Sequence, residues 1–398
     1  MLKGGKLRKL LFFMAVMSTS SVFAQGLTSD KPPIFIGFDG AFGQKTNTAA
    51  KAIESGINVA IAEINAAGGV LNGRPLKLIT TDNKGVTARG KDNFIELAQN
   101  KDMVAVMGGK YSPISVETLP EAHRLKMPLI SVWGSADQIT DHSYKPSYSF
   151  RVSLKDDWGV EGMMKRISQK YRAKKACAFL PNTAWGRSAD NVIKAKSADF
   201  GLSFTVIRWY NWGDASLKMP YKECQEAGGQ AILFVGNEKE GAILIKEVAN
   251  LPQSQRLPIV SHWGISGGVI HELVGSDLDK VELDVVQTFT FIGNNRPKAK
   301  FLGEQVMKSS NLKNTTEIQS PVGVAQAYDA THLVALAINK AQSTDREKIR
   351  NALESSIEFI GAIRNYKPAF TRDRHDALSA ENLLFVTIKP DGTLIPAK

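Results

Sequence analysis

The sequence predicts an α/β protein with two Rossmann-like lobes, each built on a parallel sheet and joined by a multi-strand hinge. Short apolar runs of strand length alternate along the chain with longer segments whose apolar residues recur at helical spacing. This alternation starts again near residues 148–154, which predicts a second lobe of the same kind. The 398-residue chain is long enough for two domains of ordinary size.

The first 24 residues have the pattern of a cleavable secretory signal peptide. Basic residues precede an apolar run over 10–17 that is too short to span a bilayer, and the segment ends in Val22-Phe23-Ala24, which suits a cleavage site. Cleavage after Ala24 lowers the formal net charge from +11 to +7. The remaining charge is spread along the chain, so we expect no nucleic-acid partner. In a Gram-negative bacterium the mature protein is expected in the periplasm.

The first lobe is expected to begin with a strand over 34–38 and a helix that continues to Ala67. Gly68 and Gly69 end this helix, because glycine readily takes the left-handed conformation of a C-cap. A strand over 76–80 and a helix over 87–99 continue the alternation. The first helix has one apolar face, formed by Ile53, Ile57, Ala60, Ile61 and Ile64.

The stretch 104–140 predicts a small-ligand site. It contains a buried strand over 104–107, a glycine turn, a helix over 114–125 and a second strand over 127–131. Both turns leave the same edge of a parallel sheet, where strand ends and helix N-termini direct free backbone groups into a crevice. Five polar and aromatic residues are placed at the mouth of this crevice: Tyr111, Ser112, Trp133, Gly134 and Ser135.

The second lobe repeats the alternation, and the end of the chain crosses between the lobes. Helices over 298–308 and 322–341 are assigned to the first lobe, whereas a last strand over 383–388 returns to the second. Several crossovers make a hinge on which the lobes can close around a ligand. The predicted boundaries are 25–151 plus 288–379 for lobe 1, and 152–287 plus 380–398 for lobe 2.

The sequence offers no sign of a metal or a cofactor. The histidines lack paired metal-ligand spacing, no G-x-G-x-x-G motif follows the first strand, and no Walker A motif is present. The two cysteines are Cys177, in a predicted strand, and Cys224, in a predicted helix. A disulfide is compatible with this count, but we favour buried free thiols.

Six segments, in order along nearly the whole mature chain, carry a family resemblance. They are AIAEINAAGGVLNGRPLKLITTDN (60–83), GGKYS (108–112), PLISVWGSADQIT (128–140), SYSFRVS (147–153), NTAWGRS (182–188) and PDGTLIPAK (390–398). Together they resemble the periplasmic branched-chain amino-acid (Leu/Ile/Val) binding proteins, which are type I solute-binding proteins of ABC importers. The resemblance implies a non-enzymatic, monomeric protein that closes on a small ligand and presents it to ABC permease subunits in the inner membrane.

The resemblance also implies how a ligand is held. Family members bind the ligand carboxylate with a serine hydroxyl and backbone N–H groups after the glycine turn, and this position is Ser112 here. A carbonyl and a hydroxyl from the next loop correspond to Trp133, Gly134 and Ser135. A family tyrosine that opens a second-lobe helix corresponds to Trp185. A carboxylate at a helix N-terminus gains charge-assisted hydrogen bonds and a favourable helix dipole.

One position departs from the family pattern. Amino-acid-binding members pair the ligand ammonium with a glutamate, and this chain has Trp263 there; another family tyrosine falls near Asn237 or Glu238. A buried ammonium without an acidic partner would cost several kcal/mol. Either Glu238 or Asp39 supplies the charge, or the ligand has no α-ammonium. The resemblance implies a small ligand such as a branched-chain or other apolar amino acid, and we favour an aromatic or aliphatic carboxylate without an ammonium as the departure from it.

The tryptophans support this choice. Trp133, Trp185 and Trp263 fall on loops at predicted strand ends facing the cleft, which favours a flat or apolar ligand between indoles. A cation in an aromatic cage is the alternative. The other three are expected to pack structurally: Trp158, Trp209 and Trp212.

Two other functions remain as alternatives. Residues 264–268, GISGG, match the G-x-S-x-G nucleophile elbow, so a serine hydrolase would use Ser266 with His332 or His375. We favour no catalytic residues, because an HGGG-type oxyanion segment is missing and short patterns arise easily in glycine-rich loops. The other alternative keeps the fold, with the protein reporting its ligand to a membrane sensor instead of a permease.

Overall fold

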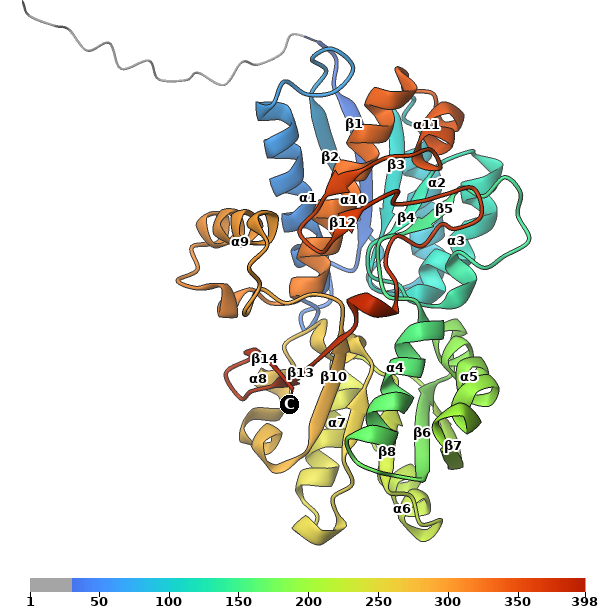
Figure 1. Cartoon of the computed structure of the whole chain (residues 1–398), viewed down its shortest axis with the longest axis vertical. Helices are drawn as coiled ribbons and strands as arrows, with labels where there is room; N and C mark the ends of the chain where they lie inside the picture. Colours follow the sequence, from blue (N-terminus) through green and yellow to red (C-terminus); the bar gives the residue numbers. More distant parts are fainter. Residues whose placement is uncertain (1–30, 398) are drawn as a thin grey trace, which may run out of the picture.

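The computed structural model describes residues 31–397, which form two lobes with a sheet in each (Figure 1). The signal peptide predicted over residues 1–24 lies outside the described residues. Within residues 31–397, no helix is both long and apolar enough to cross a membrane.

The first lobe, at the top of Figure 1, contains a five-stranded sheet in which all neighbouring strands are parallel. Its strands are β1 (Ile34–Gly40), β2 (Leu76–Asp82), β3 (Met103–Gly108), β4 (Leu129–Ser131) and β5 (Ser149–Arg151), in the spatial order β2-β1-β3-β4-β5. Its helices are α1 (Ala49–Ala66), α2 (Thr87–Gln99), α3 (Ser112–Arg124), α9 (Pro297–Ser310), α10 (Pro321–Ala341) and α11 (Arg346–Leu353).

The second lobe contains a seven-stranded sheet whose last two strands come from the C-terminal part of the chain. Its strands are β6 (Lys175–Pro181), β7 (Ser203–Tyr210), β8 (Ala231–Phe234), β9 (Ile259–Ser261), β10 (Leu283–Gln287), β13 (Leu384–Ile388) and β14 (Leu394–Pro396), in the order β14-β13-β10-β9-β8-β6-β7. Strand β13 pairs antiparallel with both β10 and β14, and the other neighbouring strands of this sheet are parallel. Its helices are α4 (Asp156–Gln169), α5 (Ala184–Lys196), α6 (Lys218–Glu226), α7 (Glu238–Ala249) and α8 (Ile270–Val274). The predicted α/β fold with two parallel-sheet lobes is confirmed.

The core of the first lobe depends on close packing between α1 and α10. Helix α1 buries the apolar face that its sequence predicts, whereas α10 is buried along almost its whole length because it packs against both α1 and α11. At Gly56 a Cβ atom would lie 2.1 Å from the carbonyl oxygen of Val324. Only glycine allows the two helices to approach this closely.

The chain crosses between the lobes after β5, after β10 and after β12 (Asn365–Tyr366), which pairs with β11 (Phe359–Ile360). Arg151, at the first crossover, is fully buried and donates to Asp376 Oδ1 at 2.7 Å and to the carbonyl of Ala136 at 2.9 Å. Burial alone would raise the pKa of Asp376, but the charges of Arg151 and Lys155 outweigh it and lower that pKa. This network ties the loop after β4 to the hinge.

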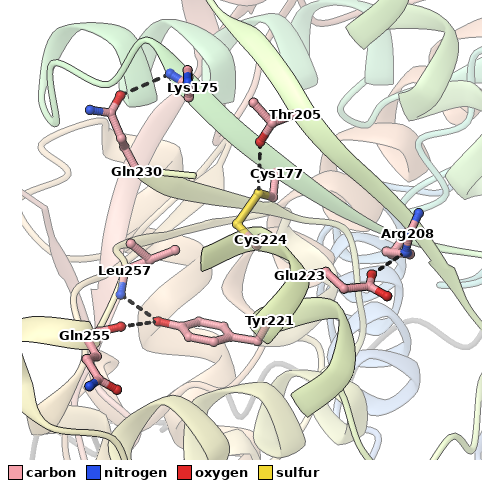
Figure 2. Close-up of a disulfide and its surroundings, with 10 residues drawn as sticks. All are labelled: Lys175, Cys177, Thr205, Arg208, Tyr221, Glu223, Cys224, Gln230, Gln255 and Leu257. Atoms are coloured by element: carbon pink, nitrogen blue, oxygen red, sulfur yellow. Dashed lines mark hydrogen bonds and ion pairs between the residues drawn. A yellow bond between two sulfur atoms is a disulfide. The ribbon is translucent and has the colours of Figure 1, made fainter. Parts of the chain in front are cut away.

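A disulfide joins Cys177 of β6 to Cys224 of α6 (Figure 2), so the expectation of free thiols is wrong. The two Cα atoms lie 5.9 Å apart, within the range that a disulfide requires. Helix α6 is also fixed by Tyr221, whose hydroxyl donates to the carbonyl of Gln255 and accepts from the amide of Leu257, both at 2.8 Å. This packing brings the two sulfur atoms together, and spacing in the sequence does not reveal it.

Replacing both cysteines, as Cys177→Ala with Cys224→Ala, should lower the free energy of unfolding by about 2–4 kcal/mol. The bond closes a loop with a sequence separation of 47 residues, and losing it gives the unfolded chain more freedom. Chemical denaturation of the mature protein measures the effect. A reductant should destabilise the wild type similarly and leave the variant unchanged; equal stabilities of the two proteins would contradict this prediction.

Candidate functional site

The loops that follow β3 and β4 in the first lobe face those that follow β8 and β9 in the second. These are the carboxyl ends of parallel strands, where α/β sheets form ligand sites. All ten residues predicted for the site are buried. The ten are Asp39, Tyr111, Ser112, Trp133, Gly134, Ser135, Trp185, Asn237, Glu238 and Trp263.

The two lobes contact each other directly through backbone hydrogen bonds. The amides of Thr48 and Ala49, at the start of α1, donate to the carbonyl of Gly267 at 3.1 and 3.3 Å. In return, the amide of Val269 donates to the carbonyl of Thr46 at 3.0 Å. The structure therefore represents the lobes closed on each other.

A buried ion pair crosses the interface. Lys110 Nζ lies 2.5 Å from Glu238 Oε2, and each side chain is only 2% exposed. Lys110 also donates to the carbonyl of Gly267 at 3.2 Å, and Thr46 donates to Glu238 Oε1 at 2.9 Å. Both carboxylate oxygens of Glu238 are therefore occupied by groups of the first lobe.

The indole rings of Trp133 and Trp263 meet between the lobes, with ring centroids 5.6 Å apart and an interplanar angle of 45°. Two glycines make room for Trp133, since a Cβ atom on Gly267 or Gly323 would lie 2.9 or 2.8 Å from its ring. Trp185 packs edge-on against His262 at 4.9 Å. The Nε1 atoms of Trp133 and Trp185 are buried and have no hydrogen-bond partner among the described residues. Each is a donor that a ligand oxygen could satisfy.

Ser112 begins α3 and is held by the loop after β4. Its Oγ accepts from the amides of Ser135 at 3.0 Å and Ala136 at 3.2 Å. A serine hydroxyl has two acceptor sites and one donor hydrogen. The two amides use the acceptor sites, so the hydroxyl hydrogen is available for an anionic ligand group.

Tyr111 lies at the interface but contacts other side chains. Its ring packs against Trp212 of the second lobe at 5.3 Å, and its hydroxyl donates to Gln44. Burial, followed by the charges of Glu238 and Glu240, raises the pKa of Tyr111. It therefore remains neutral. The contact also places Trp212, which we expected to pack structurally, against a residue predicted for the site.

Asp39 is engaged inside the first lobe. Its Oδ1 accepts from Thr81 at 2.8 Å and Asn93 at 2.7 Å, and its Oδ2 accepts from Asn83 at 2.7 Å. Burial, which outweighs these hydrogen bonds, raises its pKa. Three side chains of its own lobe thus hold the carboxylate that the sequence offered as one source of charge for a ligand ammonium.

Sequence reasoning missed three residues that the structure brings to this site. Lys110 lies within the GGKYS segment, and His262 directly precedes Trp263, so their positions were visible in the sequence. Asp156 begins α4, and its amide donates to the carbonyl of Ser135 at 2.9 Å. Their partners could not be predicted from the sequence, because each partner comes from a different loop.

The catalytic alternative is not supported by the contacts of Ser266. Its hydroxyl donates to the carbonyl of Trp263 at 2.7 Å and accepts from Gln287 at 2.8 Å. His332 contacts Glu63, and His375 contacts Glu354. Neither histidine is placed to act as a base for Ser266. Within residues 31–397, no group of three or more His, Cys, Asp or Glu residues could hold a metal ion.

Residues 33–393 match the family model described as periplasmic binding protein. The chain belongs to this family. A curated relative is the leucine-, isoleucine-, valine-, threonine- and alanine-binding protein of Pseudomonas aeruginosa, 24% identical over 307 residues, which are 76% of this chain and 77% of the relative. The family resemblance identified in the sequence is confirmed.

Solved structures of similar proteins show the same fold. A type 1 periplasmic binding protein from Bordetella pertussis has a TM-score of 0.80 and is 19% identical, covering 92% of this chain and all of its own. A solute-binding protein of an ABC transporter from R. palustris, in complex with 4-hydroxybenzoate, has a TM-score of 0.75 and is 16% identical, covering 92% of this chain and 96% of its own. These relatives are named as binding proteins rather than enzymes, and the family is periplasmic.

The Lys110–Glu238 pair should control how far the lobes close. Lys110→Met alone leaves the Glu238 carboxylate buried without its cation, and breaking one side of a buried pair costs roughly 3–5 kcal/mol. Opening the lobes returns the carboxylate to water, so we expect the ligand-free variant to show a larger radius of gyration than the wild type in small-angle X-ray scattering.

Two further variants complete this experiment. Adding Glu238→Gln to Lys110→Met removes the uncompensated charge and should restore the wild-type radius. Lys126→Met is the matched control, because it breaks an exposed pair with Glu347 that does not join the lobes. Identical radii for the wild type and the Lys110→Met protein would show that the pair does not hold the lobes together.

Proposed function

We propose that this protein is the substrate-binding component of an ABC importer and that it captures a small apolar or aromatic carboxylate in the periplasm by closure of its two lobes. The observation that carries this proposal is the Lys110–Glu238 pair, combined with Trp263 at the family position of the ammonium-binding glutamate. Glu238, which the sequence offered as a replacement for that glutamate, already has a cation.

The ion pair argues against an α-ammonium group at the usual position. A ligand ammonium that bound Glu238 would compete with Lys110, whose amine is 2% exposed. The displaced lysine would then be a buried charge without a partner, at a cost of several kcal/mol. A ligand without an ammonium leaves the pair intact.

The donors at the interface suit a carboxylate. Ser112 offers its hydroxyl hydrogen, and Trp133 offers a buried Nε1–H group without a partner among the described residues. Hydrogen bonds to an ionised acceptor are stronger than neutral ones. The surrounding indoles supply the apolar and flat surfaces that the rest of such a ligand needs.

The ligands named for similar proteins span the same chemistry. The P. aeruginosa relative is named for amino acids with small or branched side chains, whereas the R. palustris structure contains 4-hydroxybenzoate. Both classes carry a carboxylate, and only the first carries an ammonium. The charges in this site favour the second class. Permease subunits in the inner membrane are the proposed partners, and the closed form of a monomer is the form they would bind.

A thermal-shift screen of residues 25–398 tests this function. A ligand that binds only the folded state raises the unfolding midpoint, and a concentration of 100 times the dissociation constant adds about 2.7 kcal/mol. We expect aromatic or aliphatic carboxylates to stabilise the protein and leucine, valine and quaternary amines to leave it unchanged. Stabilisation by leucine but not by ammonium-free acids would contradict the proposed ligand class.

Ser112→Ala should weaken binding of the carboxylate found in that screen by roughly 1.5–3 kcal/mol, the range for a hydrogen bond to a charged group. Isothermal titration calorimetry measures the change. Thr118→Val is the matched control, because its hydroxyl lies on the same helix and donates only to the carbonyl of Ile114. The control should bind like the wild type; equal affinity in the Ser112→Ala protein would remove Ser112 from the site.

A further inference from the structure

A second polar group lies against the proposed site and has no assigned role. Asp156 and His262 are both fully buried, and His262 Nε2 lies 3.1 Å from Asp156 Oδ1. Asp156 is linked to the site because its amide donates to the carbonyl of Ser135, and His262 is linked because its ring packs on Trp185. The pair therefore adjoins residues proposed to surround the ligand from both lobes.

Three polar atoms of this group have no hydrogen-bond partner among the described residues: Asp156 Oδ2, His262 Nδ1 and Trp185 Nε1. Buried polar atoms in native proteins are almost always paired, and leaving them unpaired is costly. Three such atoms on adjoining side chains, beside residues proposed to hold the ligand, indicate that ligand groups satisfy them.

The chemistry of the three atoms defines that group. An ionised carboxylate only accepts, so Nε2 of His262 is the nitrogen that donates to Asp156, and in the neutral ring Nδ1 is then an acceptor. Nε1 of Trp185 is a donor only. The missing partner must therefore both donate and accept hydrogen bonds.

A hydroxyl group meets both requirements. It can donate to His262 Nδ1 and accept from Trp185 Nε1–H, and Asp156 Oδ2 then takes a further donor, such as an ordered water or a second hydroxyl. An ammonium has three donors and no acceptor, so it would leave the indole N–H unpaired. A second carboxylate is also disfavoured here, because burial and the charge of Asp156 already raise the pKa of Asp137 to about 7.

We infer that Asp156, His262 and Trp185 form a subsite for a hydroxyl group of the ligand, so that the ligand is a hydroxylated aromatic or alicyclic acid. This inference rests on the proposed function, because it assumes a carboxylate ligand in the same cleft. His262 and Trp185 are specificity-determining residues in this arrangement, and Asp156 is a positioning residue that fixes the tautomer of His262.

The test compares ligands that differ by one hydroxyl group. Calorimetry with the mature wild-type protein should give dissociation constants for 3- or 4-hydroxybenzoate that are about 10-fold or more lower than that for benzoate. If the ring of the ligand is alicyclic, the matching comparison is 4-hydroxycyclohexanecarboxylate with cyclohexanecarboxylate. The quantity compared between proteins is a ratio: the dissociation constant of the acid without the hydroxyl group, divided by that of the hydroxylated acid.

Two substitutions of His262 separate its two nitrogens. His262→Gln keeps an amide able to donate to Asp156 and loses the Nδ1 acceptor, so the ratio should fall to about 1. His262→Asn keeps an acceptor near the Nδ1 position, so it should retain most of the ratio. Trp185→Phe keeps a flat ring and loses the N–H donor, and it should lower the ratio even if one of the histidine variants fails to fold.

The outcomes separate this inference from the proposed function. If carboxylates bind but the hydroxyl ratio is near 1 in the wild type, or is the same in all variants, the subsite is overturned and the function stands. Tighter binding of 4-(aminomethyl)benzoate than of 4-hydroxybenzoate would show that the group takes a cation, which also overturns the subsite. If no carboxylate of either series binds, the proposed function fails and the subsite fails with it.

Discussion

The buried contact between Lys110 and Glu238 is the constraint on which the closed structure depends. Both side chains are 2% exposed, and they belong to different lobes, so each would be an unpaired buried charge if the lobes closed without the other. The surrounding hydrogen bonds from Thr46 and to Gly267 exist only in the same arrangement. Lobe closure, the ion pair and the charge available to a ligand therefore depend on one another. A ligand that binds here must leave the pair in place or replace both partners.

The fold explains why these groups meet. In each lobe the parallel strands end at the same edge, and loops after β3, β4, β8 and β9 carry the polar and aromatic residues of the site. Arg151 holds one part of the hinge together, because it joins the loop after β4 to Asp376 in the last crossover. The lobes can thus move relative to each other while the loop that carries Trp133 keeps its shape.

The two lobes could be predicted from the sequence because strands and helices are recognised from the local spacing of apolar residues. Their alternation along the chain indicates the two parallel sheets. It also placed Ser112, Trp133, Trp185 and Trp263 near the carboxyl ends of strands, and the structure buries all four, although Ser112 and Trp185 lie in the first turns of α3 and α5 rather than on loops. It did not identify the partners. Lys110 and Glu238 are 128 residues apart, and the choice of Lys110 rather than a ligand ammonium as the partner of Glu238 depends on lobe closure. The disulfide was missed for the same reason, since helix packing sets the distance between Cys177 and Cys224.

Such a site selects its ligand mainly because a wrong ligand leaves polar protein atoms unpaired. Attractive contacts with the ligand contribute less to selectivity. An acid of the right size but without a hydroxyl would still bury its ring among the indoles, yet it would leave polar atoms of His262 and Trp185 without partners. Each such atom costs about 1–3 kcal/mol, comparable to the gain from burying an entire apolar side chain. An amino acid would meet a different penalty, because its ammonium must compete with Lys110 for Glu238. The charges and the unpaired atoms therefore reject different classes of ligand, and only a hydroxylated acid without an ammonium avoids both penalties.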